Sequence, residues 1–302
     1  MTLLCSAADY ASAPIKIIVP FAPGGGLDIS ARKIAPLLSK STGVAVVVEN
    51  NTGGNSSIGT NIVVNSKPDG KTLLISTVGT LDGSTAEMAV PLYNWQKDLR
   101  PVAIAVPLSP FVLVTTAKYT SIKQFTEALK TNRISYGSPT VAGSHVILMR
   151  ELITATGSTN KDIVPVIYKS SATLLTDLVS GQLDATFATG YAVQGLIATG
   201  KLTALAVASS KRLNYLPDTP TFAELGFGKV NVGNDYYGFW VAAATPDAIV
   251  EELRNNIYSY VGSSGELRKE FLEMNFIDPH YQIPRNPEEE QRRYVKLIRS
   301  LK

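Results

Sequence analysis

Cysteine and histidine are scarce in this chain. Its 302 residues include one cysteine, Cys5, and two histidines, His145 and His280. A single cysteine cannot form an internal disulfide, and neither a His-Glu-x-x-His motif nor a cysteine pair for zinc is present. We therefore expect no metal and no cofactor. The Gly-x-Ser-x-Gly sequence is also absent, which excludes the nucleophile elbow of an α/β-hydrolase.

Charge is low and long hydrophobic runs are missing. Charged residues make up 18% of the sequence and the formal net charge is +3. No Lys/Arg stripe is interleaved with aromatic residues, so we expect no nucleic-acid partner. No apolar run approaches 20 residues, the length that a membrane-spanning helix needs. The hydrophobic content of 45% is typical of a globular protein, and the length suits one large domain or two ordinary ones.

The strongest motif begins with an apolar run over residues 15–19, which predicts a strand that stops at Pro20. Three glycines follow at 24–26, and the spacing of Ile34, Leu37 and Leu38 then predicts a helix. A helix that starts after a glycine loop offers unpartnered amides to an anion. The loop lacks the Gly-Lys-Ser/Thr and G-x-G-x-x-G patterns of nucleotide sites. We predict a carboxylate held by neutral donors; the alternative is a tight strand-to-helix turn without a ligand.

Strand-like runs alternate with helix-like stripes along most of the chain, which predicts α/β architecture with parallel sheet. The predicted strands cover residues 15–19, 44–49, 72–76, 103–106, 111–115, 163–166, 185–187, 204–208 and 239–243. Capping patterns predict helix starts at Ser121, at Thr245-Pro246 and at Asn286-Pro287, and Gly181 predicts a helix end. Pro36 lies inside the first helix, where we expect a lost hydrogen bond or a kink.

Short motifs in a fixed order resemble those of one family. They include residues 17–26 with Asp28, 46–50, 58–59, 68–70, 136–138, 144–145, 166–169, 181–184, 200–202, 216–221, 237–238 and 245–246. In this order the chain resembles the substrate-binding proteins of tripartite tricarboxylate transporters, the Bug or TctC type. The resemblance covers residues 14 to the C-terminus.

This resemblance implies a bilobal fold of the type II periplasmic-binding-protein class, with two parallel or mixed sheets flanked by helices and a ligand cleft between the lobes. We expect lobe 1 to contain residues 14–118 and 237–302, lobe 2 to contain 119–236, and residues 1–13 to be a residual signal segment or a disordered end. The implied protein is a periplasmic monomer that closes on a small carboxylate and delivers it to membrane permease subunits. A di- or tricarboxylate and an aromatic acid remain open as ligands.

The resemblance also implies which residues bind the ligand. It places one loop at 21–26, a second at 138–144 ahead of the helix near His145, and strand ends near 76–80 and 188–191. The predicted ligand-binding residues are Phe21, Ala22, Pro23, Gly24, Gly25, Gly26, Asp28, Ser76, Thr77, Gly79, Thr80, Ser138, Thr140, Gly143, Ser144, His145, Ala188, Thr189, Tyr191 and Asp235.

Several of these residues have an equally simple structural interpretation. Asp28 lies in a first helical turn, where a carboxylate is stabilised by the helix dipole. Hydroxyls at 138–144 would cap a helix, and Thr77 and Thr80 would be ordinary polar residues of a loop. Trp240, in an apolar strand, is typical of a core. The chain departs from the family at Pro139-Thr140-Val141 and at Asn55-Ser56, which replace more glycine-rich runs.

We expect binding without catalysis, because no residue is placed as nucleophile or base near the glycine loop. Two alternatives stay open: an enzyme that acts on an anionic substrate, and a ligand-sensing subunit of a signalling system.

Overall fold

The computed structural model describes residues 13–86, 92–107, 110–141, 143–231, 236–262, 265–273 and 286–300. The chain divides into two compact units. Unit 1 contains residues up to Val106 with Tyr236–Glu270 and Gln282–Arg292. Unit 2 contains Pro107–Asp235 with Phe271–Tyr281 and Arg293–Lys302. The chain therefore first passes from unit 1 to unit 2 ahead of the strand at 111–115, upstream of the crossing near residue 118 that the sequence suggested.

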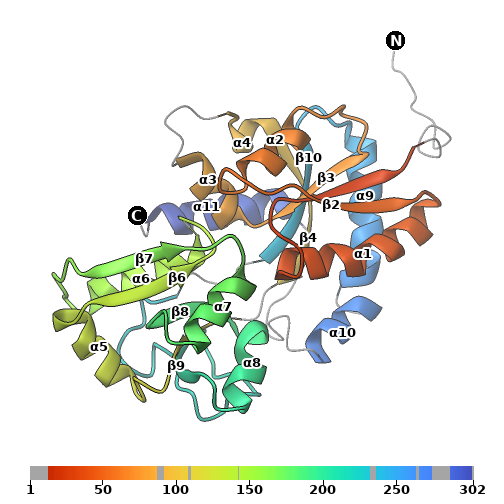
Figure 1. Cartoon of the computed structure of the whole chain (residues 1–302). Coiled ribbons are helices and arrows are strands. Elements are labelled where there is room, and N and C mark those ends of the chain that lie inside the picture. Colours follow the sequence, from red (N-terminus) through yellow and green to blue (C-terminus); the bar gives the residue numbers. More distant parts are fainter. Residues whose placement is uncertain are drawn as a thin grey trace. The chain divides into compact units, whose positions relative to one another are not determined.

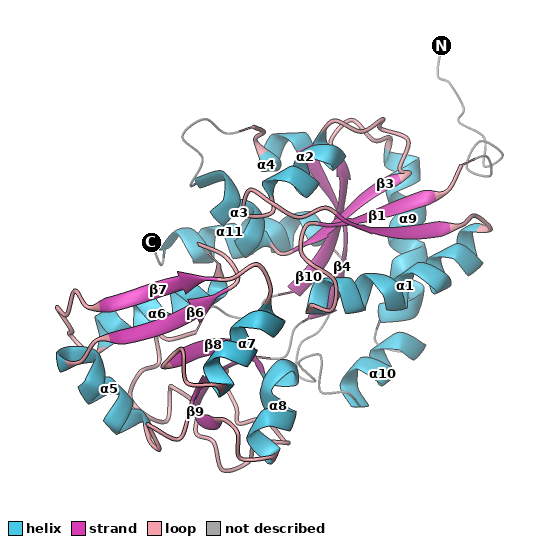
Figure 2. Ribbon diagram, viewed as in Figure 1, coloured by secondary structure: helices cyan, strands magenta, loops and turns pink. Residues whose placement is uncertain are grey.

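Unit 1 is built on a five-stranded sheet of order β2-β1-β3-β10-β4, here called sheet 1 (Figures 1 and 2). Its strands are β1 (Ile15–Val19), β2 (Val46–Asn50), β3 (Thr72–Ser76), β4 (Leu99–Pro107) and β10 (Tyr236–Ala242). β1 is parallel to β2 and β3, whereas β10 is antiparallel to β3. The ends of β1, β2 and β3 and the beginning of β10 therefore meet at one edge, which we call the carboxyl edge of sheet 1.

Helices follow the strands of unit 1 and cover both faces of sheet 1 (Figure 2). They are α1 (Gly26–Thr42), α2 (Ser57–Val64), α3 (Val78–Ala86), α4 (Trp95–Asp98) and α9 (Asp247–Val261). The C-terminal helices are α10 (Glu266–Glu273) and α11 (Pro287–Ser300). Trp240 is 1% exposed, as a core residue should be, and its indole N–H donates to Gln291 of α11 at 2.9 Å.

Unit 2 contains a second five-stranded sheet, sheet 2, of order β7-β6-β8-β5-β9. Its strands are β5 (Phe111–Thr115), β6 (Ile134–Ser138), β7 (Ile163–Ile167), β8 (Ala185–Thr189) and β9 (Thr203–Ala208). β6 is parallel to β7 and β8, and β5 is antiparallel to β8 and β9. The carboxyl edge of sheet 2 thus holds the ends of β6, β7 and β8 and the beginning of β5.

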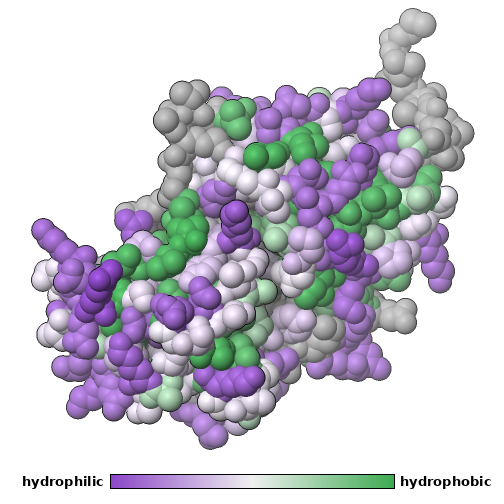
Figure 3. Space-filling model, viewed as in Figure 1, coloured by the Kyte–Doolittle hydropathy of each residue, from purple (hydrophilic) through white to green (hydrophobic). Residues whose placement is uncertain are grey.

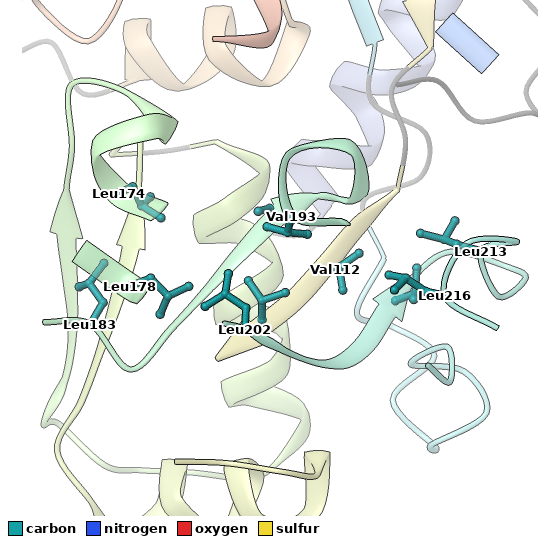
Figure 4. Packing of buried hydrophobic residues seen from close by; sticks show 11 residues of the cluster. Val112, Leu174, Leu178, Leu183, Val193, Leu202, Leu213 and Leu216 are labelled. Atoms are coloured by element: carbon teal, nitrogen blue, oxygen red, sulfur yellow. The ribbon is translucent and has the colours of Figure 1, made fainter. Parts of the chain in front are cut away.

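The helices of unit 2 enclose a core of branched aliphatic side chains. They are α5 (Ile122–Thr131), α6 (Ser144–Ala155), α7 (Ser171–Val179) and α8 (Gly190–Ala198). Figure 4 shows Leu174 and Leu178 of α7 beside Leu183, and Leu202 beside Val112 of β5. Leu174, Leu178 and Val112 are almost completely buried. Burial of a leucine side chain contributes roughly 1.5–3 kcal/mol, so this cluster is a main source of the stability of unit 2.

The two sheets share one topology. In each, the first parallel strand lies between the second and the third, and an antiparallel strand occupies the fourth place. In sheet 1 that antiparallel strand is β10, the first strand after the chain leaves unit 2, and in sheet 2 it is β5, the first strand after unit 1. Both sheets are therefore mixed, and the first strand of each leads into a helix at the carboxyl edge.

The structure confirms most predicted elements and corrects two details. The strands at 15–19, 72–76 and 111–115 have the predicted bounds, and Ser121 caps α5 by accepting the Gln124 amide at 3.3 Å. The strand β6 was missed, because glycine and serine weaken its apolar pattern. α9 starts one residue later than predicted, with Pro246 as N-cap, since the Thr245 hydroxyl donates to the Ala242 carbonyl instead.

Large hydrophobic side chains reach the surface along β7, an outer strand of sheet 2, and along α2. Val164 and Ile167 of β7 are exposed, as are Ile58 and Ile62 of α2, and Figure 3 shows hydrophobic surface over β7 and α2. Pro165 lies within β7 and limits pairing of this edge with another strand. Within the described residues, no helix is long and apolar enough to cross a membrane.

Candidate functional site

The predicted glycine loop lies at the carboxyl edge of sheet 1. It connects β1 to α1, whose N-cap residue is Gly25. Gly24 has φ +85°, a left-handed conformation that favours glycine. The first amide of α1 that has a backbone acceptor is that of Ile29, which donates to the Gly25 carbonyl at 2.9 Å. Within the described residues the amides of Gly25, Gly26 and Leu27 have no acceptor, so the positive end of α1 is open to an anion.

Asp28 holds the loop in shape. Its carboxylate accepts hydrogen bonds from the Gly24 amide at 2.9 Å and from the side chains of Arg32 and Asn50 at 3.0 Å. Asn50 also donates to the Phe21 carbonyl at 3.0 Å. Burial alone would raise the pKa of Asp28, but Arg32, the Gly24 amide and Asn50 hold it below its ordinary value. All these partners are protein groups, which supports the structural interpretation of Asp28 and removes Gly24 from the available donors.

Tyr237 of β10 packs against the first residue of α1. A Cβ placed on Gly26 would lie 3.1 Å from the Tyr237 ring carbon Cζ and closer still to its hydroxyl. Gly26 is therefore a glycine because Tyr237 occupies that space. Among the remaining loop residues, Phe21 and Ala22 are half-buried and Pro23 is exposed. The sequence analysis did not select Tyr237 as a site residue, since its position depends on the register between β10 and β3.

The end of β3 lies between the glycine loop and β10. Ser76 is fully buried and its hydroxyl has no hydrogen-bond partner. Thr77 instead caps α3: its hydroxyl accepts the Thr80 amide at 3.0 Å and lies 3.0 Å from the Thr80 hydroxyl. Gly79 is buried within that first turn. Thr77 and Thr80 are therefore partners in a helix cap rather than the loop polar residues of the alternative interpretation, and Ser76 is the polar group here without a hydrogen-bond partner.

The second predicted loop lies at the carboxyl edge of sheet 2, between β6 and α6. Ser138 stabilises the loop internally, donating to the Thr140 carbonyl at 2.6 Å and accepting the Thr140 amide at 3.2 Å. The N-cap of α6 is Gly143, which has no side chain to accept an amide, and Ser144 is the first residue of the helix. The Thr140 hydroxyl is buried without a partner and occupies the space that a Cβ on Gly143 would need.

The end of β8 meets the beginning of β5 at the same edge of sheet 2. Ala188 is buried, and Thr189 pairs with Phe111 and is the N-cap of α8. The ring of His145, in the first turn of α6, packs edge-on against Phe111 with centroids 5.0 Å apart. Burial lowers the pKa of His145 to about 4, so the ring is neutral at pH 7. Phe111 is an aromatic residue of this edge that the sequence analysis missed.

The remaining predicted residues do not change this arrangement. Tyr191 is half-buried in the first turn of α8. Asp235 lies outside the described residues, as does Ala142 of the second loop. Within the described ranges, no three His, Cys, Asp or Glu side chains are grouped to hold a metal ion.

Two of the helices that start at these edges have glycine as their N-cap residue. α7 is capped by Ser170, which accepts the Thr173 amide at 3.2 Å, and α3 is capped by Thr77. α1 and α6 follow the first strand of their sheets, and their N-caps, Gly25 and Gly143, have no hydroxyl or carboxylate. At α1, where the amides of Gly25, Gly26 and Leu27 have no acceptor among the described residues, an external anion can be their partner.

An open hollow of about 780 Å³ lies elsewhere on unit 2, along α5. Its lining includes Lys118, which pairs with Asp184 at 2.6 Å, and Gln124, whose side-chain oxygen accepts the Thr120 amide at 2.9 Å. Asp184 lies at the start of β8 and therefore at the edge opposite the second loop. Lys118 and Gln124 therefore already have protein partners, unlike the amides at the start of α1.

Two α/β units with the same mixed-sheet topology, each with an uncapped helix after its first strand, define a solute-binding protein of the periplasmic-binding-protein fold. Comparison with known proteins identifies the family. The model of the TctC family, described as "Tripartite tricarboxylate transporter family receptor", matches residues 30–299. The chain is 34% identical over 263 residues to Protein BugT of Bordetella pertussis, covering 83% of this chain and 77% of BugT. It therefore belongs to the TctC family of receptors.

Solved structures agree with this assignment. The periplasmic binding protein BugD superposes with a TM-score of 0.82 at 25% identity, covering 97% of this chain and 96% of BugD. R. palustris Rpa4515 with adipate superposes with a TM-score of 0.84 at 26% identity, covering 96% of this chain and 95% of that one. The family and these neighbours are solute-binding receptors.

Proposed function

We propose that this chain is a periplasmic receptor that binds a small carboxylate and delivers it to the membrane subunits of a tripartite tricarboxylate-type transporter. The observation that carries the proposal is the N-terminus of α1, where the amides of Gly25, Gly26 and Leu27 have no acceptor within the described residues. The Asp28 network fixes the loop before a ligand arrives, so little conformational entropy is lost on binding.

Unit 2 offers the same chemistry through α6. Its glycine N-cap and the unpartnered Thr140 hydroxyl supply neutral donors. The adipate bound by Rpa4515 supports a carboxylate as the ligand class. The donors proposed here carry no formal charge, so affinity should fall only weakly with ionic strength. We propose that the receptor acts as a monomer and releases its ligand chemically unchanged.

A thermal-shift screen of mono-, di- and tricarboxylates, aromatic acids and amino acids tests the ligand class, because binding raises the melting temperature by mass action. Isothermal titration calorimetry then measures affinity at low and high salt. Recovery of the ligand unchanged after long incubation separates a receptor from an enzyme, for which a product would appear. If no carboxylate shifts the melting temperature, the proposal fails.

The variant Gly25→Asp tests the site itself. Gly25 has φ −79° and ψ 168°, which any residue adopts, and a Cβ there would meet only the Ala22 carbonyl at 3.9 Å. An aspartate N-cap would stabilise α1 by only about a few tenths of a kcal/mol relative to glycine, and its carboxylate would occupy the amides in place of the ligand. We expect a higher melting temperature together with at least a tenfold loss of carboxylate affinity. Unchanged affinity would place the ligand elsewhere.

A further inference from the structure

Two buried hydroxyls of unit 1 lack hydrogen-bond partners. Ser56 is 2% exposed and Ser76 is fully buried, and neither Oγ has a partner. A buried hydroxyl is costly to leave unpaired, so each such group calls for an explanation. Ser76 ends β3, and Ser56 is the N-cap of α2. Both residues therefore lie where strands and helices meet at the carboxyl edge of sheet 1.

Ser56 and Ser76 lie on the same face of sheet 1. A Cβ on Gly59 of α2 would lie 3.0 Å from the Cα and Cβ of Pro20, so α2 packs directly on the residue that follows β1. Ile18 pairs with Leu74 in register. Pro20 and Ser76 each lie two residues further along, and alternation points their side chains to the same face. α2 thus covers the face from which Ser76 projects.

The position of Tyr237 shows that α1 covers the opposite face of sheet 1 from α2. Gly238 pairs with Ser76, so the preceding residue, Tyr237, projects to the opposite side, where it meets Gly26 of α1. The helices α1 and α2 therefore begin at the same edge of sheet 1 but on its two faces, as Figure 2 shows. Each directs the positive end of its dipole toward this edge.

Ser56 holds an unusual position for a serine. As N-cap it would normally accept an amide of α2, but its side chain caps nothing. Its φ is +75° and that of Asn55 is +51°, after Gly53 and Gly54 with positive φ. This backbone favours glycine, yet the position holds a serine whose buried hydroxyl has no partner. The amides of Ser57 and Ile58 donate to the carbonyls of Gly54 and Gly53, whereas those of Ser56 and Gly59 have no acceptor among the described residues.

We propose that Ser56 and the N-terminus of α2 bind the second carboxylate of a dicarboxylate whose first carboxylate is bound at α1. This inference rests on the proposed function and deepens it. Ser76, on the strand next to β1, supplies a further hydroxyl donor on the α2 side. A monocarboxylate bound at α1 would leave these groups without a partner, so the site selects for a ligand with an acceptor at each end.

The test compares two variants with three pairs of straight-chain acids: succinate with butyrate, glutarate with valerate, and adipate with hexanoate. Ser56→Gly removes the hydroxyl and suits φ +75°, so it should not impair folding. Ser170→Ala is the matched control, because Ser170 caps α7 with a satisfied hydroxyl in unit 2. Isothermal titration calorimetry gives the affinities, and urea titration gives the stability of each variant.

We expect Ser56→Gly to weaken binding of the preferred dicarboxylate about tenfold, the scale of one hydrogen bond to a charged group, and to leave the paired monocarboxylate within twofold. Ser170→Ala should lower stability without changing selectivity. No effect on either acid, or equal effects on both, would overturn the inference, because Ser56 would then not distinguish the second carboxylate. A wild-type protein that binds monocarboxylates but no dicarboxylate would overturn the inference alone, whereas one that binds no carboxylate would overturn the proposed function.

Discussion

Tyr237 fills the space beside Gly26, and this contact fixes the first turn of α1 against β10. The two residues come from separate chain segments of unit 1, and the pairing of Gly238 with Ser76 brings them together. The Tyr237 ring therefore lies beside one of the residues whose amides are proposed to bind the carboxylate.

Gly26→Ala should lower both stability and affinity. A methyl group at Gly26 would overlap the Tyr237 hydroxyl and lie 3.1 Å from Cζ, and overpacking of this kind costs about 1–3 kcal/mol. In a Tyr237→Ala background the same substitution should cost less than about 0.5 kcal/mol, since the clash is gone. A double-mutant cycle by urea unfolding measures this coupling. Equal costs in both backgrounds would show that Tyr237 is not the obstacle.

The sequence predicted helix starts after the glycine loop at 24–26 and near His145, and in the structure Gly25 and Gly143 are the N-caps of these two helices. That their loops bind an anion stays a prediction. The strand β6 was missed because Gly137 lowers its apolar character; the glycine is needed since a Cβ there would lie 2.7 Å from Leu174. That requirement comes from tertiary packing of α7 on β6, which no local pattern reveals.

The roles of single polar groups were also beyond the sequence. Asp28, Thr77 and Thr80 match a ligand site in residue type, but each has protein partners in the structure. Ser56 looked like one polar residue among several near a helix start, and only its burial and its missing partner distinguish it. The sequence therefore predicted where the loops lie, and only the structure shows which of their side chains already have protein partners.

Asp28→Asn should destabilise unit 1 by about 2 kcal/mol at pH 7, the scale of lost hydrogen bonds to a buried charge. The pKa of Asp28 is held below 3.8, so the folded state gains this stability above pH 3.8 and loses it as the pH falls through the lowered value. Urea unfolding at pH 7 and near pH 3 measures the difference, which should shrink at the lower pH. Glu224→Gln is the control: Glu224 pairs with Arg212 at an exposed site, where such pairs contribute little.

His145 should make the protein less stable in mild acid. Its pKa is about 4 in the folded state against an ordinary 6.5, so unfolding takes up a proton between these values. Stability should therefore fall as the pH decreases from 6.5 to 4, and His145→Gln should remove this part of the pH dependence. Melting temperatures across this range measure it, with His280→Gln as the control. An unchanged profile in His145→Gln would show that the ring is hydrated rather than buried against Phe111.

Thr140→Val should separate ligand binding from folding in unit 2. The Thr140 hydroxyl is buried without a partner, so replacing it with a methyl group should leave stability unchanged or raise it by up to about 1 kcal/mol. Carboxylate affinity should fall about tenfold if this hydroxyl donates to the ligand.

The control is Thr186→Val, because the Thr186 hydroxyl is equally buried but donates to the Gly137 carbonyl at 2.8 Å. That variant should lose about 1–2 kcal/mol of stability and keep its affinity. A stable Thr140→Val protein with wild-type affinity would remove the second loop from the binding site and leave α1 as its anion-binding element.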